Sequence, residues 1–187
     1  MAESQGDTEG RTFSVRSASD LLGKLHHEAN YVWGGGVPAD VRLRTYAILN
    51  CALTAWQIKD WVFAELRETN QLSALERLAG RSIVTAAEFG TWLCEQNRYL
   101  AMCYQIATAT KHVTVSRKAR PQVRTFSATR SSEVQPSGSW TELVVQAGDE
   151  QIVAEDLMVY LYATWITIFR DLDLLDTGDP LRRPSAP

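Results

Sequence analysis

Asp60 is the residue whose surroundings point most directly to a polar site. It falls on an apolar helical stripe that also holds Trp56 and Phe63, and Gln57 lies about one helical turn before it. A carboxylate in such a position needs a hydrogen-bonding partner, a solvent-filled cavity or a raised pKa. We therefore predict one of two places for Asp60. One is a pocket inside a helical bundle, lined by Trp56, Gln57, Asp60 and Trp61, and the other is a structural hydrogen bond or a rim position.

A second candidate site begins at Lys111 and His112, which close another predicted helix. Cations are favoured at a helix C-terminus, so a simple helix cap is one interpretation of this pair. From Lys111 to Arg130 the chain carries six basic residues and no acidic one. Such a stretch is either a solvated hairpin or a surface for an anionic partner, with weak binding of a nucleic acid backbone as one form. The candidate anion-binding residues are Arg117, Lys118, Arg120 and Arg124.

Common catalytic and metal-binding signatures are absent from the sequence. It contains no phosphate-binding glycine motif, no H-E-x-x-H and no G-x-S-x-G. His26 and His27 are adjacent, so on a helix their side chains point about 100° apart and cannot hold one metal ion on a single face. Cys51, Cys94 and Cys103 form no C-x-x-C pair and are typical of small buried apolar residues. We expect no metal and no cofactor.

Composition indicates a globular chain that does not enter a membrane. Hydrophobic residues make up 45% and charged residues 22% of the 187 residues. The most apolar run, 157–169, is flanked by Asp156 and Arg170 and is shorter than the ~20 residues that a spanning helix needs. The first ten residues are polar and acidic, without an apolar signal region. We therefore expect a cytoplasmic protein.

Helical periodicity predicts most of the secondary structure. Helices are expected over about 17–30, after a capping box at Ser17, and over 38–69. The helix over 38–69 has two adjacent apolar stripes, which places it at the centre of a bundle. Two further capping boxes, Ser73…Glu76 and Thr85…Glu88, open a short helix and a longer helical region to Lys111. That region is either one helix or two with a break near Asn97, and a final helix covers 154–175.

Alternating residues after His112 predict a small β insertion. Val113 and Val115 are expected to pair with 123–127 across a turn at 118–121, and 140–146 is expected to pair with 151–153. Trp140, beside a Ser/Gly loop, is the tryptophan that we most expect to be exposed.

These elements define a mainly α fold. We predict a bundle of four or five helices with a small antiparallel β insertion, at about 113–153, before the C-terminal helix. One domain is expected over 11–175, between a disordered tail at 1–10 and an irregular tail at 176–187.

Two segments resemble those of a group of uncharacterised bacterial helical proteins. AWQIKDW at 55–61 is similar to their A-W-H-x-x-D-W segment, and QIATATKH at 105–112 is similar to their D-I-A-N-x-x-K-H segment. The resemblance covers about residues 40–170 and implies a shared helical fold. Gln57, Gln105 and Thr108 stand where that group has His, Asp and Asn, so a catalytic site at these positions would be incomplete.

A weaker similarity connects the chain to the HEPN superfamily of bacterial defence and toxin ribonucleases. That resemblance would make His112 a general acid or base and Lys111 a stabiliser of phosphate charge. However, no Arg precedes His112 at the spacing of the R-x(4–6)-H motif of that superfamily.

The sequence leaves three functional hypotheses, and the first is our leading one. It is a non-catalytic module that binds a protein partner or a second copy of itself, in a setting such as bacterial defence or a toxin–antitoxin pair. The second is a HEPN-like metal-independent ribonuclease. The third is a bundle that binds a small molecule in a pocket beside Asp60.

Overall fold

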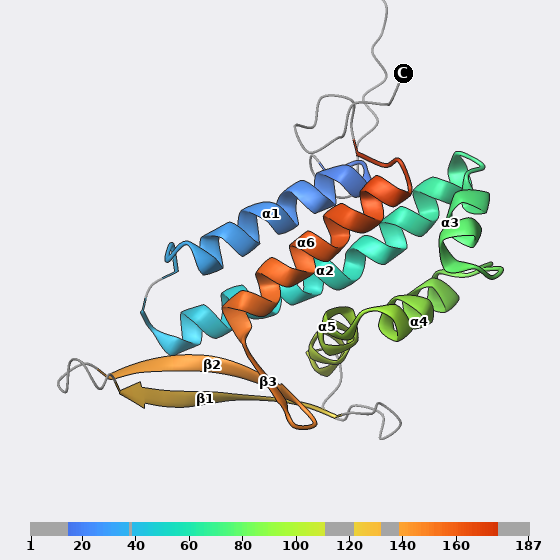
Figure 1. Ribbon diagram of the computed structural model, residues 1–187. Helices are drawn as coiled ribbons and strands as arrows, with labels where there is room; N and C mark the ends of the chain where they lie inside the picture. The colour runs from blue at the N-terminus through green and yellow to red at the C-terminus, as the bar shows by residue number, and fades with distance from the viewer. Residues whose placement is uncertain (1–14, 38, 111–121, 132–138, 176–187) are drawn as a thin grey trace, which may run out of the picture.

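The computed structural model describes residues 15–37, 39–110, 122–131 and 139–175. Six helices and a three-stranded antiparallel sheet make up this part of the chain (Figure 1). The mainly α fold with a small antiparallel sheet before the last helix is thereby confirmed. The elements in chain order are α1 (Ala18–Trp33), α2 (Val41–Glu68), α3 (Leu72–Ala79), α4 (Ala86–Gln96), α5 (Arg98–Ala109), β1 (Val123–Ser131), β2 (Ser139–Ala147), β3 (Glu150–Val153) and α6 (Ala154–Asp171).

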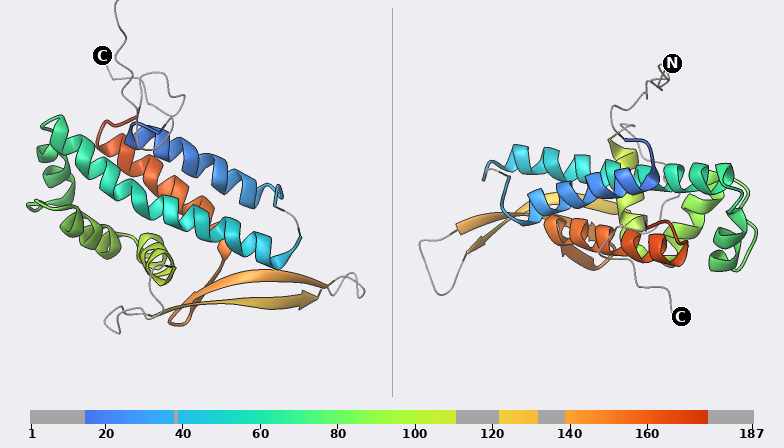
Figure 2. Two further views of the ribbon diagram at one scale, coloured as in Figure 1. Left: turned by 180° about the vertical axis from the view of Figure 1, so that it is seen from behind. Right: turned by 90° about the horizontal axis from the view of Figure 1, so that it is seen from above.

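The long helix α2 is central, as its two apolar stripes predict. The helices α1 and α6 lie alongside it in both views, and α4 and α5 pack against it from another side (Figure 2). Ala52, Ala55 and Val62 on the first stripe are completely buried. Side chains from every helix and from β2 join one hydrophobic core, which includes Trp165 and Phe169 of α6.

Capping residues set most of the helix boundaries. Ser17 and Asp20 form the predicted capping box before α1, and Thr85 and Glu88 form the one before α4. Hydrogen bonds lower the pKa of both carboxyl groups, and the largest contribution comes from the backbone N–H just before each box, that of Arg16 for Asp20 and that of Val84 for Glu88. A change of helix direction also occurs at Asn97.

Asn97 divides the region that the sequence left open as one helix or two. It ends α4 with an extended backbone, and its side chain accepts hydrogen bonds from the backbone N–H groups of Tyr99 and Leu100 at the start of α5. The two helices can therefore turn away from one another. Together with α2 they enclose a cleft.

The predicted capping box Ser73…Glu76 is wrong. α3 begins at Leu72, so Ser73 lies inside the helix, and the N-cap residue Gln71 makes no side-chain capping bond. The reason is that the chain turns directly from α2 into α3 through Asn70, whose φ of 57° is in the left-handed region. Glu76 instead accepts a hydrogen bond from the Ser82 hydroxyl.

The sheet covers one end of the bundle and contains a pairing that the sequence did not predict. β1 pairs with β2 along nine residues, from Val123 opposite Ala147 to Ser131 opposite Ser139. The predicted pairing of β2 with β3 is confirmed. Val113, Val115 and the turn at 118–121 lie outside the described residues, so the pairing predicted for them stays a prediction.

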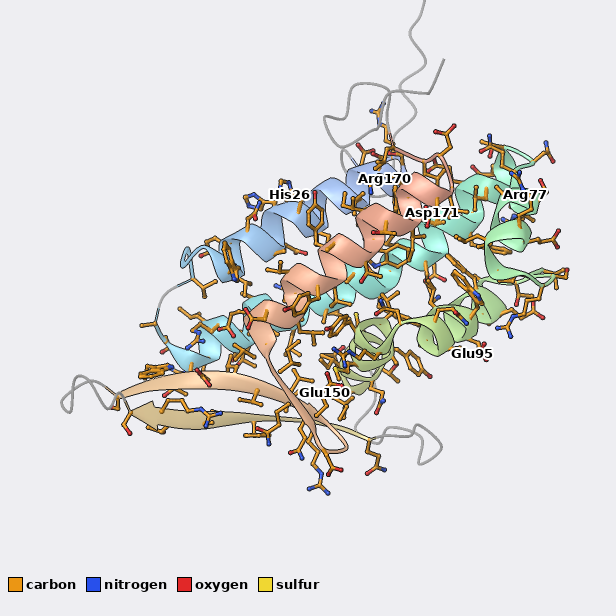
Figure 3. All side chains as sticks on the ribbon, viewed as in Figure 1. His26, Arg77, Glu95, Glu150, Arg170 and Asp171 are labelled. Carbon is orange, nitrogen blue, oxygen red and sulfur yellow. The ribbon has the colours of Figure 1, made fainter. Side chains whose placement is uncertain are left out.

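Two arginines of the helices attach the sheet to the bundle. Arg44 of α2 donates two hydrogen bonds to Glu155 at the start of α6 and a third, of 2.6 Å, to the carbonyl oxygen of Thr141 in β2. Arg98 of α5 pairs with Glu150 at 2.9 Å, where the β2–β3 turn approaches that helix (Figure 3). None of the helices in the described part is long and apolar enough to cross a membrane.

Candidate functional site

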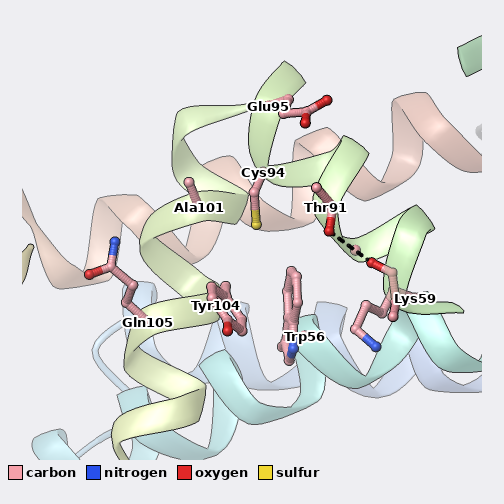
Figure 4. A pocket seen from close by; sticks show the side chains of 10 residues that line it. Trp56, Lys59, Thr91, Cys94, Glu95, Ala101, Tyr104 and Gln105 are labelled. Atoms are coloured by element: carbon pink, nitrogen blue, oxygen red, sulfur yellow. Dashed lines mark hydrogen bonds between the residues drawn. The ribbon is translucent and has the colours of Figure 1, made fainter. Parts of the chain in front are cut away.

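A cleft of about 740 Å³ lies between α2, α4 and α5 (Figure 4). Its walls are mostly apolar or aromatic, and a few polar groups reach it. Pockets that bind small molecules in proteins have this composition and measure about 300–1,000 Å³. The residues that line it are Trp56, Lys59, Ala87, Gly90, Thr91, Cys94, Glu95, Ala101, Tyr104 and Gln105.

Trp56 forms the α2 wall of the cleft and lies between two other side chains. The Tyr104 ring from α5 is tilted by 46° against it, with 4.9 Å between the ring centroids. On α2 itself, the Lys59 ammonium lies 5.3 Å from the centre of the Trp56 ring, within the range of a cation–π contact. Trp56 is therefore held in place, and its ring edge points toward Cys94 across the cleft (Figure 4).

Gly90 allows α4 to approach this wall closely. A Cβ atom at this position would lie 3.1 Å from Cδ of Lys59 and 3.4 Å from a carbon of the Trp56 ring. Glycine in the middle of a helix is unfavourable by about 1 kcal/mol relative to alanine. A side chain at this position would therefore have to share its space with the Lys59 stem, which glycine leaves in place.

Cys94 is a protonated, half-buried thiol on the α4 wall. Burial raises its pKa to about 11, and the Glu95 charge adds to that shift. A thiol in this state is a soft apolar surface rather than a nucleophile or a metal ligand at neutral pH. Cys51 and Cys103 are fully buried, as predicted, while Cys94 is the cysteine that opens to the cleft.

The remaining polar groups of the cleft are engaged in contacts of their own. Glu95 pairs with Arg81 at 2.7 Å, and Figure 4 shows its carboxylate turned away from Trp56. The Thr91 hydroxyl donates to the carbonyl oxygen of Ala87, which leaves its lone pairs as acceptors. The side-chain oxygen of Gln105 accepts a hydrogen bond from the backbone N–H of Val123 at 2.9 Å, which ties the start of β1 to α5.

The structure separates the four residues that we predicted to line one pocket. Trp56 lines the cleft, whereas Asp60 and Trp61 border a different surface hollow beside Glu65, and Gln57 is exposed. The Asp60 side chain is 55% exposed and pairs with Lys59 at 2.5 Å. The prediction that these four residues line one internal pocket is therefore wrong. A step of four residues advances about 40° around a helix, and this rotation carries Asp60 past the wall that Trp56 forms.

The second predicted site lies almost wholly outside the described residues. Lys111, His112, Arg117, Lys118 and Arg120 belong to the segment that the structure does not describe, so their roles stay predictions. Of the candidate anion-binding residues only Arg124 is described, and it is exposed on β1.

The tryptophan and histidine predictions have mixed outcomes. Trp140 is 48% exposed, as expected, but Trp33 at the end of α1 is more exposed, at 64%. His26 stacks on Tyr162 of α6 with 4.8 Å between ring centroids. The described residues contain no group of three or more His, Cys, Asp or Glu side chains placed to hold a metal ion.

Most of the cleft was not predicted from the sequence. The pattern around Asp60 drew attention to Trp56, whereas Lys59, Gly90 and Tyr104 look like ordinary helix residues. One signal was available, because a glycine inside an amphipathic helix often has a packing or functional reason.

Comparisons with known proteins add no further identification: no family model, curated protein or solved structure matches this chain. The resemblances to the bacterial group and to the HEPN superfamily therefore stay hypotheses.

Proposed function

We propose that this protein is a helical bundle that binds a small, largely apolar molecule in the cleft between α2, α4 and α5. The observation that carries this proposal is the cleft itself, with about 740 Å³ of space beside the Trp56–Tyr104 pair. Aromatic side chains bind apolar ligands with little loss of conformational entropy, because they have few rotatable bonds. The fixed position of Trp56 between Tyr104 and Lys59 reduces that loss further.

The site is proposed for binding rather than for covalent chemistry. Its one thiol has a raised pKa, and its one described carboxylate, Glu95, is paired with Arg81. Nucleophilic catalysis needs an activated nucleophile with a base within hydrogen-bond reach. The described lining residues do not supply that arrangement. A binding or sensing role fits their chemistry better.

A variant that fills the cleft tests this function. Ala101 is half-buried on the α5 wall, so we expect Ala101→Trp to occupy the space without disturbing the core. The matched control is Ala163→Trp on the exposed side of α6. A panel of small aromatic and aliphatic compounds is then screened by thermal shift and by the rate at which iodoacetamide alkylates Cys94 at about pH 9.5, where more of this thiol is ionised than at neutral pH.

The proposal predicts compounds that stabilise the wild type and the Ala163→Trp control and slow the alkylation of Cys94. The same compounds should lose both effects in Ala101→Trp. Stabilisation that is equal in all three proteins would place binding elsewhere and refute the proposal.

A second candidate function is the binding of a protein partner or of a second copy, our leading hypothesis from the sequence, and the sheet is the surface that we propose for it. Phe126 on β1 is 39% exposed and Trp140 on β2 is 48% exposed. β1 itself holds two arginines and no acidic residue, and Arg130 pairs with Glu142 of β2 at 3.0 Å, whereas Arg124 is exposed. Aromatic residues and arginine are the types enriched in protein interfaces.

Light scattering after size exclusion tests the self-association form of this candidate. The double variant Phe126→Ser, Trp140→Ser should convert a dimer into a monomer if the sheet forms the interface. A wild-type protein that is monomeric at high concentration would remove self-association and leave only a different partner.

A further inference from the structure

Lys59 is the one sheltered cation among the described residues that line the cleft. Its side chain is 13% exposed, whereas Asp60, its partner, is 55% exposed. The other ion pair at the cleft, Glu95 with Arg81, is about half exposed on both sides. A charge interaction is stronger in a less solvated place, so Lys59 is the group best placed to recognise a charge on a ligand.

The ammonium group of Lys59 can donate further hydrogen bonds. It carries three N–H donors. Within the described part of the chain, the carboxylate of Asp60 is the only oxygen in hydrogen-bond contact with it. The Lys59 stem packs where a Gly90 side chain would otherwise stand, so the ammonium is held beside the Trp56 ring.

From this juxtaposition we infer that the ligand of the cleft is a small amphipathic anion, with an apolar body against Trp56, Tyr104 and Ala101 and one carboxylate bound to the Lys59 ammonium. This inference rests on the proposed function, and it names the class of molecule that the same cleft would take.

A ligand carboxylate can compete with Asp60 for the ammonium. Asp60 is already more than half in water, so it loses little when it is displaced. A carboxylate that enters with an apolar body is held in the cleft by the burial of that body and meets Lys59 in a drier environment. The result is a charge-assisted hydrogen bond, which is about twice as strong as a neutral one.

A cationic ligand fits the site less well. It would meet the Lys59 ammonium beside Trp56, and like charges at this distance repel. The Glu95 carboxylate, the other charge on the wall, is turned away from Trp56 and already has Arg81 as a partner (Figure 4).

The experiment compares two probes of nearly equal shape by isothermal titration calorimetry. One is 2-naphthoate, which carries a carboxylate, and the other is the neutral 2-naphthamide. We expect wild-type protein to bind the carboxylate about tenfold or more tightly than the amide, as a charge-assisted bond in a sheltered place allows. The preference should weaken with added salt.

Three variants test the role of the ammonium. Lys59→Met keeps most of the apolar stem and removes the charge, so it should abolish the preference for the carboxylate while amide binding changes little. Lys59→Arg should retain part of the preference. Asp60→Asn removes the competing carboxylate and should tighten the binding of 2-naphthoate, which is the opposite direction from Lys59→Met.

The possible results separate this inference from the proposed function. Equal binding of both probes, lost in Ala101→Trp, would overturn the inference and leave the function standing. The absence of binding by either probe would overturn the inference, and the wider compound panel would decide on the function by itself. An unchanged preference for the carboxylate in Lys59→Met would show that another group binds the ligand charge, and would also overturn the inference.

Discussion

Replacing Gly90 with alanine should make the protein more stable and weaken the binding of a ligand in the cleft. The residue lies inside α4, where alanine is favoured over glycine by about 1 kcal/mol. Against this gain, the new methyl group would lie 3.1 Å from Cδ of Lys59 and 3.3 Å from Cε. These atoms belong to a flexible side chain, so Lys59 can move by a few tenths of an ångström at a cost of about 0.5 kcal/mol.

The net gain in the free energy of unfolding is therefore about 0.5 kcal/mol, or a rise in Tm of about 1–2 °C for a chain of this size. Binding of 2-naphthoate should weaken by about tenfold, because the methyl group narrows the cleft and displaces the ammonium. Differential scanning calorimetry measures the first effect and titration calorimetry the second.

Gly23→Ala is the matched control. Gly23 is exposed on α1 and a Cβ atom there meets nothing within 4 Å, so the full gain of about 1 kcal/mol should appear without any effect on binding. The difference between the two variants measures the cost of moving Lys59. A loss of more than about 1 kcal/mol in Gly90→Ala would show that Lys59 is rigidly held, and would refute the reasoning.

Three other predictions concern regions outside the cleft. Arg44→Ala should lower the free energy of unfolding, measured in urea, by about 2–4 kcal/mol, because it leaves the largely buried Glu155 unpaired. Arg42→Ala removes a long and exposed ion pair and should lower it by less than about 0.5 kcal/mol, and equal losses in the two variants would contradict this prediction. Burial raises the pKa of Cys51 from 9.0 to about 12, so above pH 9 the unfolded chain loses this proton before the folded one does. The free energy of unfolding should then decrease as the pH rises, by at most about 1.4 kcal/mol per pH unit from this thiol, and the decrease should be less steep in Cys51→Ala. Identical slopes in the two proteins would contradict this prediction. Binding of RNA or DNA, measured by mobility shift, should be weak, independent of sequence and lost between about 50 and 200 mM salt, and a triple charge reversal should reduce it; no shift at low salt would end that hypothesis. The changes in that triple variant are Arg117→Glu, Lys118→Glu and Arg120→Glu.

Much of the helical fold could be predicted because its signals are local. The Thr85…Glu88 capping box is specified by two residues three positions apart, and the stripe with Ala52, Ala55 and Val62 follows from helical spacing alone. The Ser73…Glu76 pattern matched the same rule and was wrong, because the left-handed turn at Asn70 started the helix earlier. A local signal of this kind thus fails where the turn before a helix sets the residue at which the helix begins.

The pairing of β1 with β2 and the cleft depend on contacts between distant segments. Alternation identifies a strand but does not say which strand lies beside it, so the nine-residue ladder from Val123 to Ser131 was not predicted. The cleft needs α4 and α5 to meet α2 at particular faces, which brings Tyr104 to Trp56 across 48 positions of sequence. Periodicity gives the faces of each helix but not their neighbours.

The location of a bound ligand tests the central claim most directly. With alanine methyl groups labelled by ¹³C, intermolecular NOEs are measured between the ring protons of 2-naphthoate and the protein. We predict NOEs to the methyl groups of Ala87 and Ala101, which line the cleft, and none to Ala163 on the exposed side of α6. NOEs to other alanines, with none to Ala87 or Ala101, would contradict the proposed binding site.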